Sequence, residues 1–173
     1  MDTVPGSVPG LGTRRQDRFA EELEAIPETK ALGPLFKSSN DYELTDPGTE
    51  YVVTCVIHTF LHHLVLQYDV TNTMENQVLE DVYVDVEVAD DEFEVLNHLP
   101  IKTLPFNSPA PTYVIVKLPG NASLTTSFAN TLRFVVKDVD AAGANDAGIT
   151  DEYAVRISGL FNPSSPTTTP YNK

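Results

Sequence analysis

The chain has 173 residues, a hydrophobic fraction of 41% and a formal net charge of −14, which suits one domain of ordinary size with polar ends. The charge comes from 25 acidic residues against 11 basic ones. Because such a field repels nucleic acid and anionic lipid, we expect no nucleic-acid partner and no direct membrane insertion. The first residues lack the apolar segment of a secretion signal, so a cytosolic protein is expected.

The N-terminal part reads as a linker that carries one short helix. Residues 1–14 are rich in Gly and Pro and are expected to be disordered. From Asp17 to Ile26 the apolar residues recur at i, i+4 and i+7, starting with Phe19, among several glutamates. This spacing predicts an amphipathic helix that Pro27 ends. We therefore expect residues 1–30 to be a flexible linker with a short helix.

From Glu43 onward the apolar period becomes two, which predicts strands. Tyr51–His58 is apolar on both sides, so we expect a central strand that is covered on both faces. Val82–Val88 gives the cleanest alternation, with Asp85 and Glu87 facing water. Further candidate strands are Leu64–Thr71, Phe93–Leu96, Ile101–Leu104, Tyr113–Leu118, Ser123–Phe128, Leu132–Lys137 and Tyr153–Ile157.

Turn-forming residues separate these strands, and no helix is long enough for a crossover between parallel strands. This organisation predicts an all-β fold, a sandwich of two antiparallel sheets. We expect the sandwich to span residues 31–160. The Pro/Thr/Ser-rich residues 161–173 are expected to be a disordered tail.

Three histidines, His58, His62 and His63, raise the question of a metal site. In one strand His58 and His62 project on the same face about 13 Å apart, too far for one ion unless the chain reverses between them. No second cysteine or nearby carboxylate completes a tetrahedral set. We therefore expect no metal and interpret these residues as polar groups at a strand end and a turn.

A glycine-containing segment near the end of the chain is strongly acidic. Its carboxylates, the candidate protein-binding residues, are Asp138, Asp140, Asp146, Asp151 and Glu152. Asp138 and Asp140 fit the first and third positions of a calcium loop. Ala142 fails at the fifth, and Ile149 stands where the bidentate glutamate is required. Calcium is thus the weakest of three interpretations. The others are a solvated hairpin loop and a docking patch for a basic peptide.

The sequence carries no signature of catalysis. It contains neither a Gly-x-Ser-x-Gly elbow nor a Gly-rich phosphate loop. Acidic pairs such as Asp90-Asp91 have no apolar pocket around them in the sequence. We expect no enzyme, no catalytic residues and no cofactor.

Five blocks of the sequence, taken in order, carry a family resemblance. They are RFAEELEAIPETKALGPLFKSS (Arg18–Ser39), TEYVVTCVIHTFLHHLVLQYDVTNT (Thr49–Thr73), LEDVYVDVE (Leu79–Glu87), LPFNSPA (Leu104–Ala110) and FVVKDVD (Phe134–Asp140). Together they resemble the γ subunit of coatomer at the start of its C-terminal appendage, or ear. The resemblance covers about residues 18–155, and Tyr68 stands where the family is expected to have Phe.

The resemblance implies an immunoglobulin-like β-sandwich, hung by a linker from the trunk of the COPI vesicle coat. Its implied function is non-enzymatic, through protein–protein contacts in Golgi-to-ER and intra-Golgi vesicle transport. The implied location is cytoplasmic, peripheral on Golgi membranes and COPI-coated vesicles. The implied partners are other coatomer subunits and accessory proteins such as an Arf GTPase-activating protein. In the family that protein binds mainly a second subdomain, the platform, which we expect to be missing after Val155, so its site transfers to no residue here.

Three alternative functions belong to related or different classes. The ear of a clathrin-type adaptor shares the implied architecture, but the Leu-Gly-Pro-Leu-Phe segment (residues 32–36) favours coatomer. A generic β-sandwich binding module remains open. An extracellular adhesion domain is disfavoured because Cys55 is the only cysteine, so no disulfide can form within the chain.

Overall fold

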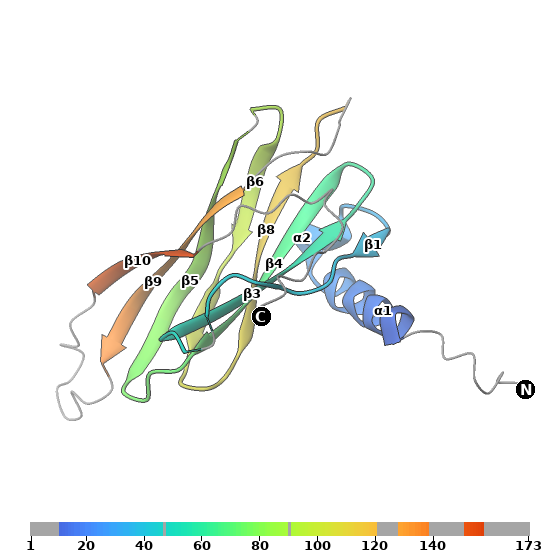
Figure 1. Ribbon diagram of the computed structural model, residues 1–173. Coiled ribbons are helices and arrows are strands. Elements are labelled where there is room, and N and C mark those ends of the chain that lie inside the picture. The colour runs from blue at the N-terminus through green and yellow to red at the C-terminus, as the bar shows by residue number, and fades with distance from the viewer. Residues whose placement is uncertain (1–10, 47, 90, 121–127, 139–150, 158–173) are drawn as a thin grey trace, which may run out of the picture.

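The structure of the protein is a computed structural model (Figure 1), which describes residues 11–46, 48–89, 91–120, 128–138 and 151–157. Two helices, α1 (Leu11–Glu24) and α2 (Pro27–Lys30), precede the strands. The strands are β1 (Lys37–Ser38), β2 (Tyr42–Glu43), β3 (Tyr51–Thr59), β4 (His63–Asn72), β5 (Gln77–Val88), β6 (Glu94–Leu99), β7 (Ile101–Leu104), β8 (Ala110–Lys117), β9 (Phe128–Asp138) and β10 (Asp151–Ile157).

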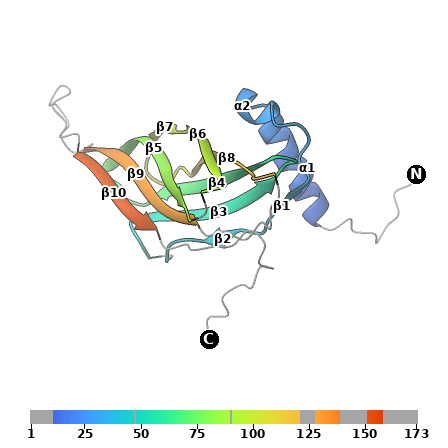
Figure 2. The same ribbon diagram turned by 90° about the horizontal axis from the view of Figure 1, so that it is seen from above.

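These strands form two sheets that pack face to face (Figures 1 and 2). Sheet A has the order β1-β3-β4-β8-β6, with β2 also paired to β3, and sheet B has the order β10-β9-β5-β7. All these strand pairs are antiparallel. Between β4 and β9 the chain passes back and forth from one sheet to the other, as it does in immunoglobulin-like sandwiches. The predicted all-β sandwich of two antiparallel sheets is confirmed.

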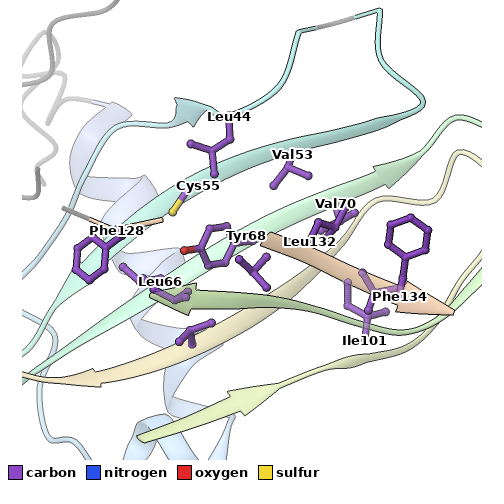
Figure 3. Close-up of a cluster of buried hydrophobic side chains, with 14 of the residues drawn as sticks. Leu44, Val53, Cys55, Leu66, Tyr68, Val70, Ile101, Phe128, Leu132 and Phe134 are labelled. Carbon is purple, nitrogen blue, oxygen red and sulfur yellow. The ribbon is translucent and has the colours of Figure 1, made fainter. Parts of the chain in front are cut away.

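The core lies between the inner faces of the sheets, where the period-two pattern places the apolar side chains. Figure 3 shows Tyr68 of β4 among aliphatic and aromatic neighbours that come from both sheets. Burial of each such side chain stabilises the fold by about 1.5–3 kcal/mol. The Tyr68 hydroxyl donates a 2.5 Å hydrogen bond to Oδ1 of Asn130 in β9, so one polar contact links the two sheets inside the core.

Sheet A has a second apolar layer on its outer face, beneath the helices (Figure 2). Leu23 of α1 packs with residues of β4 and β8, and the Phe19 ring meets the edge of the His58 imidazole at 4.8 Å between centroids. Because β3 and β4 are covered on both faces, their outward residues are apolar or buried as well. The prediction of a central strand with two covered faces is therefore confirmed for β3.

The N-terminal elements differ from the sequence prediction in two ways. Helix α1 begins at Leu11, whereas the apolar spacing predicts a start at Asp17. The added turn carries Arg15, whose guanidinium donates to the Ser39 carbonyl and to Asp41, both at 2.7 Å. Since tertiary contacts supply most helix stability in proteins, this anchoring explains why the polar residues are helical. The short strands β1 and β2 were not predicted, because two-residue strands have no readable period.

Other predicted boundaries are close to those of the structure. Helix α1 ends before Pro27, as predicted, and Pro27 then opens α2 in the first-turn position that proline favours. The predicted strand Ser123–Phe128 lies outside the described residues except for Phe128, which begins β9. The tail, residues 161–173, also lies outside the described residues.

Candidate protein-binding surface

The predicted acidic site falls at one end of sheet B. Asp138 is the last residue of β9, and Asp151 and Glu152 are the first two residues of β10. Asp151 pairs with Val136 in the antiparallel register, so the hairpin brings these three backbone positions to the same end of the sheet. Asp140 and Asp146 lie outside the described residues, so the docking patch stays a prediction.

The outer face of sheet B, which points away from sheet A, continues from that end. Along it, Lys137 Nζ lies 2.9 Å from Glu80 Oε1. The Nε–H of Arg133 donates to Asp85 Oδ2 at 3.0 Å. These ion pairs are half exposed, and pairs of this kind contribute about 0–1 kcal/mol each. Their charges therefore remain available to a partner. Both described helices lie on the opposite side of the sandwich, against sheet A (Figure 2).

A hollow of about 580 Å³ opens on this face. It lies over three adjacent strands, β5, β9 and β10, and Tyr83, Arg133 and Ala154 stand in one cross-strand row. Ala154 is exposed, and because its side chain is only a methyl group, it leaves space above the sheet at that position. The residues that line the hollow are Asp81, Tyr83, Asp85, Arg133, Phe134, Val135 and Ala154.

A β-bulge in β5 places one of the two acidic side chains of the hollow. The register of β5 against β9 shifts between Glu80 and Tyr83, and Asp81 has a φ of 50°. Bulges of this kind re-aim a side chain and bend the strand locally. Asp tolerates the left-handed region better than most residues, so the sequence suits the bend. Asp81 is exposed as a result.

The period-two interpretation missed the hollow, although one signal of the bulge is present in the sequence. Leu79 and Val82 are both fully buried, yet they are three residues apart, which an unbroken strand does not allow. The odd spacing marks an extra residue between them. Nothing in the local sequence around Arg133 or Ala154 indicates that they line a hollow. They come together with Tyr83 only because β9 pairs with both β5 and β10.

The three histidines occupy different environments, and His58 stands one residue before the end of β3, a strand-end position, but its side chain does not face solvent. His58 is fully buried in β3 under the Phe19 ring, because α1, which the local sequence of β3 does not reveal, covers that face. The chain reverses after it, so His62 lies in the exposed β3–β4 turn and His63 begins β4. Within the described stretches, no three His, Cys, Asp or Glu side chains gather in a metal-binding group.

A directional chain of hydrogen bonds satisfies His58. Gln67 Nε2 donates to Asp69 at 3.1 Å, so the Gln67 carbonyl oxygen is the atom that faces His58 at 2.8 Å. An amide oxygen only accepts, which places the imidazole proton on Nε2. Nδ1 then accepts from the Ser38 hydroxyl at 2.7 Å. His58 is therefore a neutral imidazole with both nitrogens satisfied.

Burial acts on the titratable groups of this hydrogen-bond chain. It lowers the pKa of His58 to about 4, against the opposing effect of the Gln67 hydrogen bond. Burial also raises the pKa of the Asp69 carboxyl, while its hydrogen bond from Gln67 acts the other way. Although Ser38, His58 and Asp69 are residue types of a hydrolase triad, the imidazole here is sealed from solvent and hydrogen-bonds an amide. The arrangement holds α1 and β1 on sheet A and has no access to a substrate.

No helix in the described stretches is both long and apolar enough to span a membrane. Cys55 is buried in the core, and burial raises the pKa of its thiol well above the ordinary value. A thiol in this state is a poor nucleophile. The outer face of sheet B, which the described helices leave uncovered, is a candidate surface for a partner.

Comparison with known proteins gives three kinds of match. Residues 17–157 match the family model of the coatomer gamma subunit appendage platform subdomain. Coatomer subunit gamma-2 from Xenopus tropicalis is 43% identical over 145 residues, which cover 82% of this chain and 16% of that protein. The human coatomer subunit gamma-2 is 44% identical over 149 residues, and the bovine coatomer subunit gamma-1 is 43% identical over 150. Each of these two matches covers 84% of this chain and 17% of the related protein.

Among solved structures, the crystal structure of a yeast GGA1 GAE domain matches with a TM-score of 0.40 at 9% identity. The match covers 68% of this chain and 98% of that domain, and a score this low supports no argument about function. The chain spans about one sixth of the length of the coatomer relatives.

The family model replaces one expectation from the sequence. We expected an appendage sandwich from which the platform subdomain is missing, whereas the residues that the platform model matches are those of the sandwich itself. The match covers most of the chain, and the identity to several gamma subunits exceeds 40%. The chain belongs to the coatomer gamma subunit family, over the region that the family model describes as the appendage platform subdomain.

Proposed function

We propose that the chain is a non-enzymatic appendage module of the COPI vesicle coat, which acts through protein–protein contacts in Golgi-to-ER and intra-Golgi transport. The observation that carries this proposal is the match of residues 17–157 to the gamma-subunit appendage family. Cys55 and His58 are both buried, so neither side chain can reach a substrate. The module sits on the cytoplasmic side of Golgi membranes and coated vesicles as part of the coat.

The partners follow from the same proposal. They are other coatomer subunits and accessory proteins of the coat, among them an Arf GTPase-activating protein. A single appendage contact is weak, but a coat presents many copies side by side, and linked weak contacts add through a high effective concentration. A rigid sandwich suits this role because its binding face keeps its shape while the module moves as a unit.

The docking patch we propose is the acidic β9–β10 hairpin with Asp138, Asp140, Asp146, Asp151 and Glu152. Asp138 and Asp151 lie at the same end of sheet B, and the whole chain has a net charge of −14. A concentration of negative charge speeds the capture of a basic segment and weakens with ionic strength. The patch therefore recruits a basic segment of a coat partner.

An affinity capture experiment tests the coat assignment. The tagged full chain is incubated with cytosol, and the bound proteins are identified by mass spectrometry. We expect coatomer subunits and coat accessory proteins. Enrichment of clathrin accessory proteins without coatomer contradicts the proposal and favours the adaptor-ear alternative.

A charge-neutralised variant tests the docking patch. The five hairpin carboxylates are changed to amides, and capture is compared with the unmodified chain. The matched control carries five amide substitutions on the helices, at Asp17, Glu21, Glu22, Glu24 and Glu28, so both variants lose the same charge. We expect the hairpin variant to lose coat proteins and the helix variant to keep them. Equal loss from both variants assigns the effect to net charge and contradicts a defined patch.

A further inference from the structure

We propose that the hollow on the outer face of sheet B is a specific binding pocket for an arginine side chain in an extended segment of a partner protein. The pocket adjoins the acidic hairpin at one edge, where Val135 pairs with Glu152, but its centre lies further along β10: Ala154 stands three residues from Asp151, about 10 Å along the strand. It combines an apolar floor, an aromatic ring and two carboxylates, and these are the groups that a guanidinium on an aliphatic stem requires.

The floor of the pocket accommodates the arginine stem. Ala154 and the half-buried Val135 present apolar surface at neighbouring positions of β10 and β9. Long cationic side chains commonly lay their methylene groups on such surface while the charged head stays near water. The volume of about 580 Å³ leaves ample room for one side chain with its hydration shell.

Two carboxylates supply the charge. Asp81 is exposed at the bulge and has no ion-pair partner among the described residues. Asp85 uses Oδ2 to accept from Arg133 at 3.0 Å, and within the described stretches Oδ1 has no hydrogen bond. A carboxylate accepts several donors at once, and a guanidinium offers five. Among the described residues that line the pocket, two are acidic and one, Arg133, is basic, so this lining favours a further cation.

Tyr83 narrows the choice of cation to arginine. Tyr83 lines the hollow and stands between Asp81 and Asp85 in the sequence, and its ring makes an edge contact with His98 at 5.5 Å between centroids. A planar guanidinium stacks on such a ring and still donates in its own plane to carboxylates on either side, which the compact ammonium of lysine does not do. An anionic segment meets two carboxylates here and is repelled.

The inference depends on the proposed function only in assuming a protein partner, because its geometry is independent of the hairpin and of the coat. A peptide that places its arginine in the pocket and runs towards Val135 passes the backbone of Glu152, which pairs with that residue. The two sites thus form one surface, in which the charge of the hairpin attracts a basic segment and the pocket gives specificity for arginine.

Nuclear magnetic resonance titration of the full chain tests the pocket directly. The probe is acetyl-arginine methylamide, and the matched control is its citrulline analogue, which has the same shape without the charge. We expect the arginine probe to shift backbone amide resonances of residues 81–85, 133–135 and 154, with a dissociation constant on the order of millimolar. The citrulline analogue is expected to leave them unchanged.

Two variants and a control refine the test. Asp81→Asn keeps a residue that tolerates a positive φ, and Ala154→Leu fills the floor without a change in charge. We expect Asp81→Asn to weaken arginine binding by about fivefold, the range of one exposed ion pair, and Ala154→Leu to weaken it at least as much. Glu28→Gln, on the opposite side of the sandwich, is expected to bind as the unmodified chain does.

The outcomes separate the pocket from the docking patch. Shifts confined to the hairpin, equal shifts with citrulline, or equal weakening by Glu28→Gln each overturn the pocket. Arginine binding that survives in the hairpin variant but is lost in Asp81→Asn supports the pocket even if the docking patch fails. A cooperative thermal transition in each variant establishes that the fold is intact.

Discussion

At the scale of single residues, His58 shows how a covering helix changes the chemistry of a side chain. A histidine in a strand with neighbours His62 and His63 invites a metal-binding interpretation, yet Phe19 and the hydrogen bonds to Ser38 and Gln67 enclose it as a neutral ring. A protonated imidazole can donate its second proton at Nδ1 only if the Ser38 hydroxyl turns from donor to acceptor, and the charge then remains buried. Burial of His58 therefore couples the docking of α1 to pH.

We predict that stability falls as the pH drops from about 6.5 towards 4. The pKa of His58 is 6.5 in the unfolded chain and about 4 in the folded one. Between these values the unfolded state binds more protons, so the free energy of unfolding decreases with acidification. The loss from this residue is about 2 kcal/mol between pH 7 and 5. Urea titration of the full chain at the two pH values measures it.

The control for this prediction is His58→Gln, which cannot titrate and still offers a donor and an acceptor. The pH-dependent loss in this variant is expected to shrink by about the same 2 kcal/mol. Asp69 acts in the opposite sense at lower pH, because its raised pKa makes the folded state the better proton acceptor. The variant retains Asp69 and His63, so the difference between the two proteins isolates His58. An unchanged pH dependence contradicts the prediction.

Tyr68 gives a second residue-scale prediction, inside the core. Its hydroxyl is fully buried and bonded to Asn130 across the sheets. Tyr68→Phe removes the donor and leaves the ring in place, so we expect a loss of about 1–3 kcal/mol in the free energy of unfolding. Tyr51→Phe is the matched comparison, because its hydroxyl bonds to Gln77 in a partly exposed position and should matter less. Equal losses in urea denaturation rule out a special role for the buried bond.

At the scale of elements, the predictable strands are those whose two faces differ in polarity. In β5 the buried Val82, Val84 and Val86 alternate with Asp85 and Glu87, and this alternation of apolar and charged residues was enough to predict the strand. The bulge before Val82 breaks the period, and the period therefore gave no indication of the hollow. Bulges and two-residue strands depend on the partner strand, which a local pattern does not contain.

The docking of α1 is an element-scale property that hydrogen exchange can test. Phe19 is 5% exposed, its ring meets His58, and Arg15 and Arg18 hold their guanidinium groups 4.7 and 5.5 Å from its centroid. We predict that Phe19→Ala releases the helix. Burial of such a side chain contributes about 1.5–3 kcal/mol, so amides of residues 15–24 should exchange at least about tenfold faster.

Exchange in the strands of sheet B serves as the internal reference for that experiment, because α1 does not touch them. Glu22→Ala, on the exposed side of the same helix, is the matched variant and is expected to change exchange little. Uniform acceleration throughout the chain after Phe19→Ala indicates global destabilisation and contradicts local release.

At the scale of the whole molecule, the two outer faces of the sandwich have different roles. The outer face of sheet A holds Val65, Tyr113 and Ile115 beneath the helices, and the outer face of sheet B holds charged residues and a hollow. Strand polarity indicated the sandwich, and the five ordered blocks indicated the coatomer gamma subunit family. Neither placed Asp81, Arg133 and Ala154 together, because the order β10-β9-β5 arises only when residues far apart in sequence pair.

The last prediction concerns the boundary at residue 30, before which the sequence suggested a flexible linker and after which it suggested the sandwich. A flexible linker contributes nothing to stability, whereas Phe19 and Leu23 are both buried against sheet A. We therefore predict that deletion of residues 1–30 lowers the free energy of unfolding by about 3–6 kcal/mol, from two large apolar side chains, and the melting temperature by on the order of 10 °C. The uncovered face should also bind a hydrophobic dye and promote association in analytical ultracentrifugation. Deletion of residues 1–10 alone is the matched control and is expected to preserve both the melting temperature and the sedimentation behaviour of the full chain. If the protein without residues 1–30 melts at the same temperature as the control, the helices are only a tether. If its melting temperature falls and it associates as predicted, the folded module begins at α1.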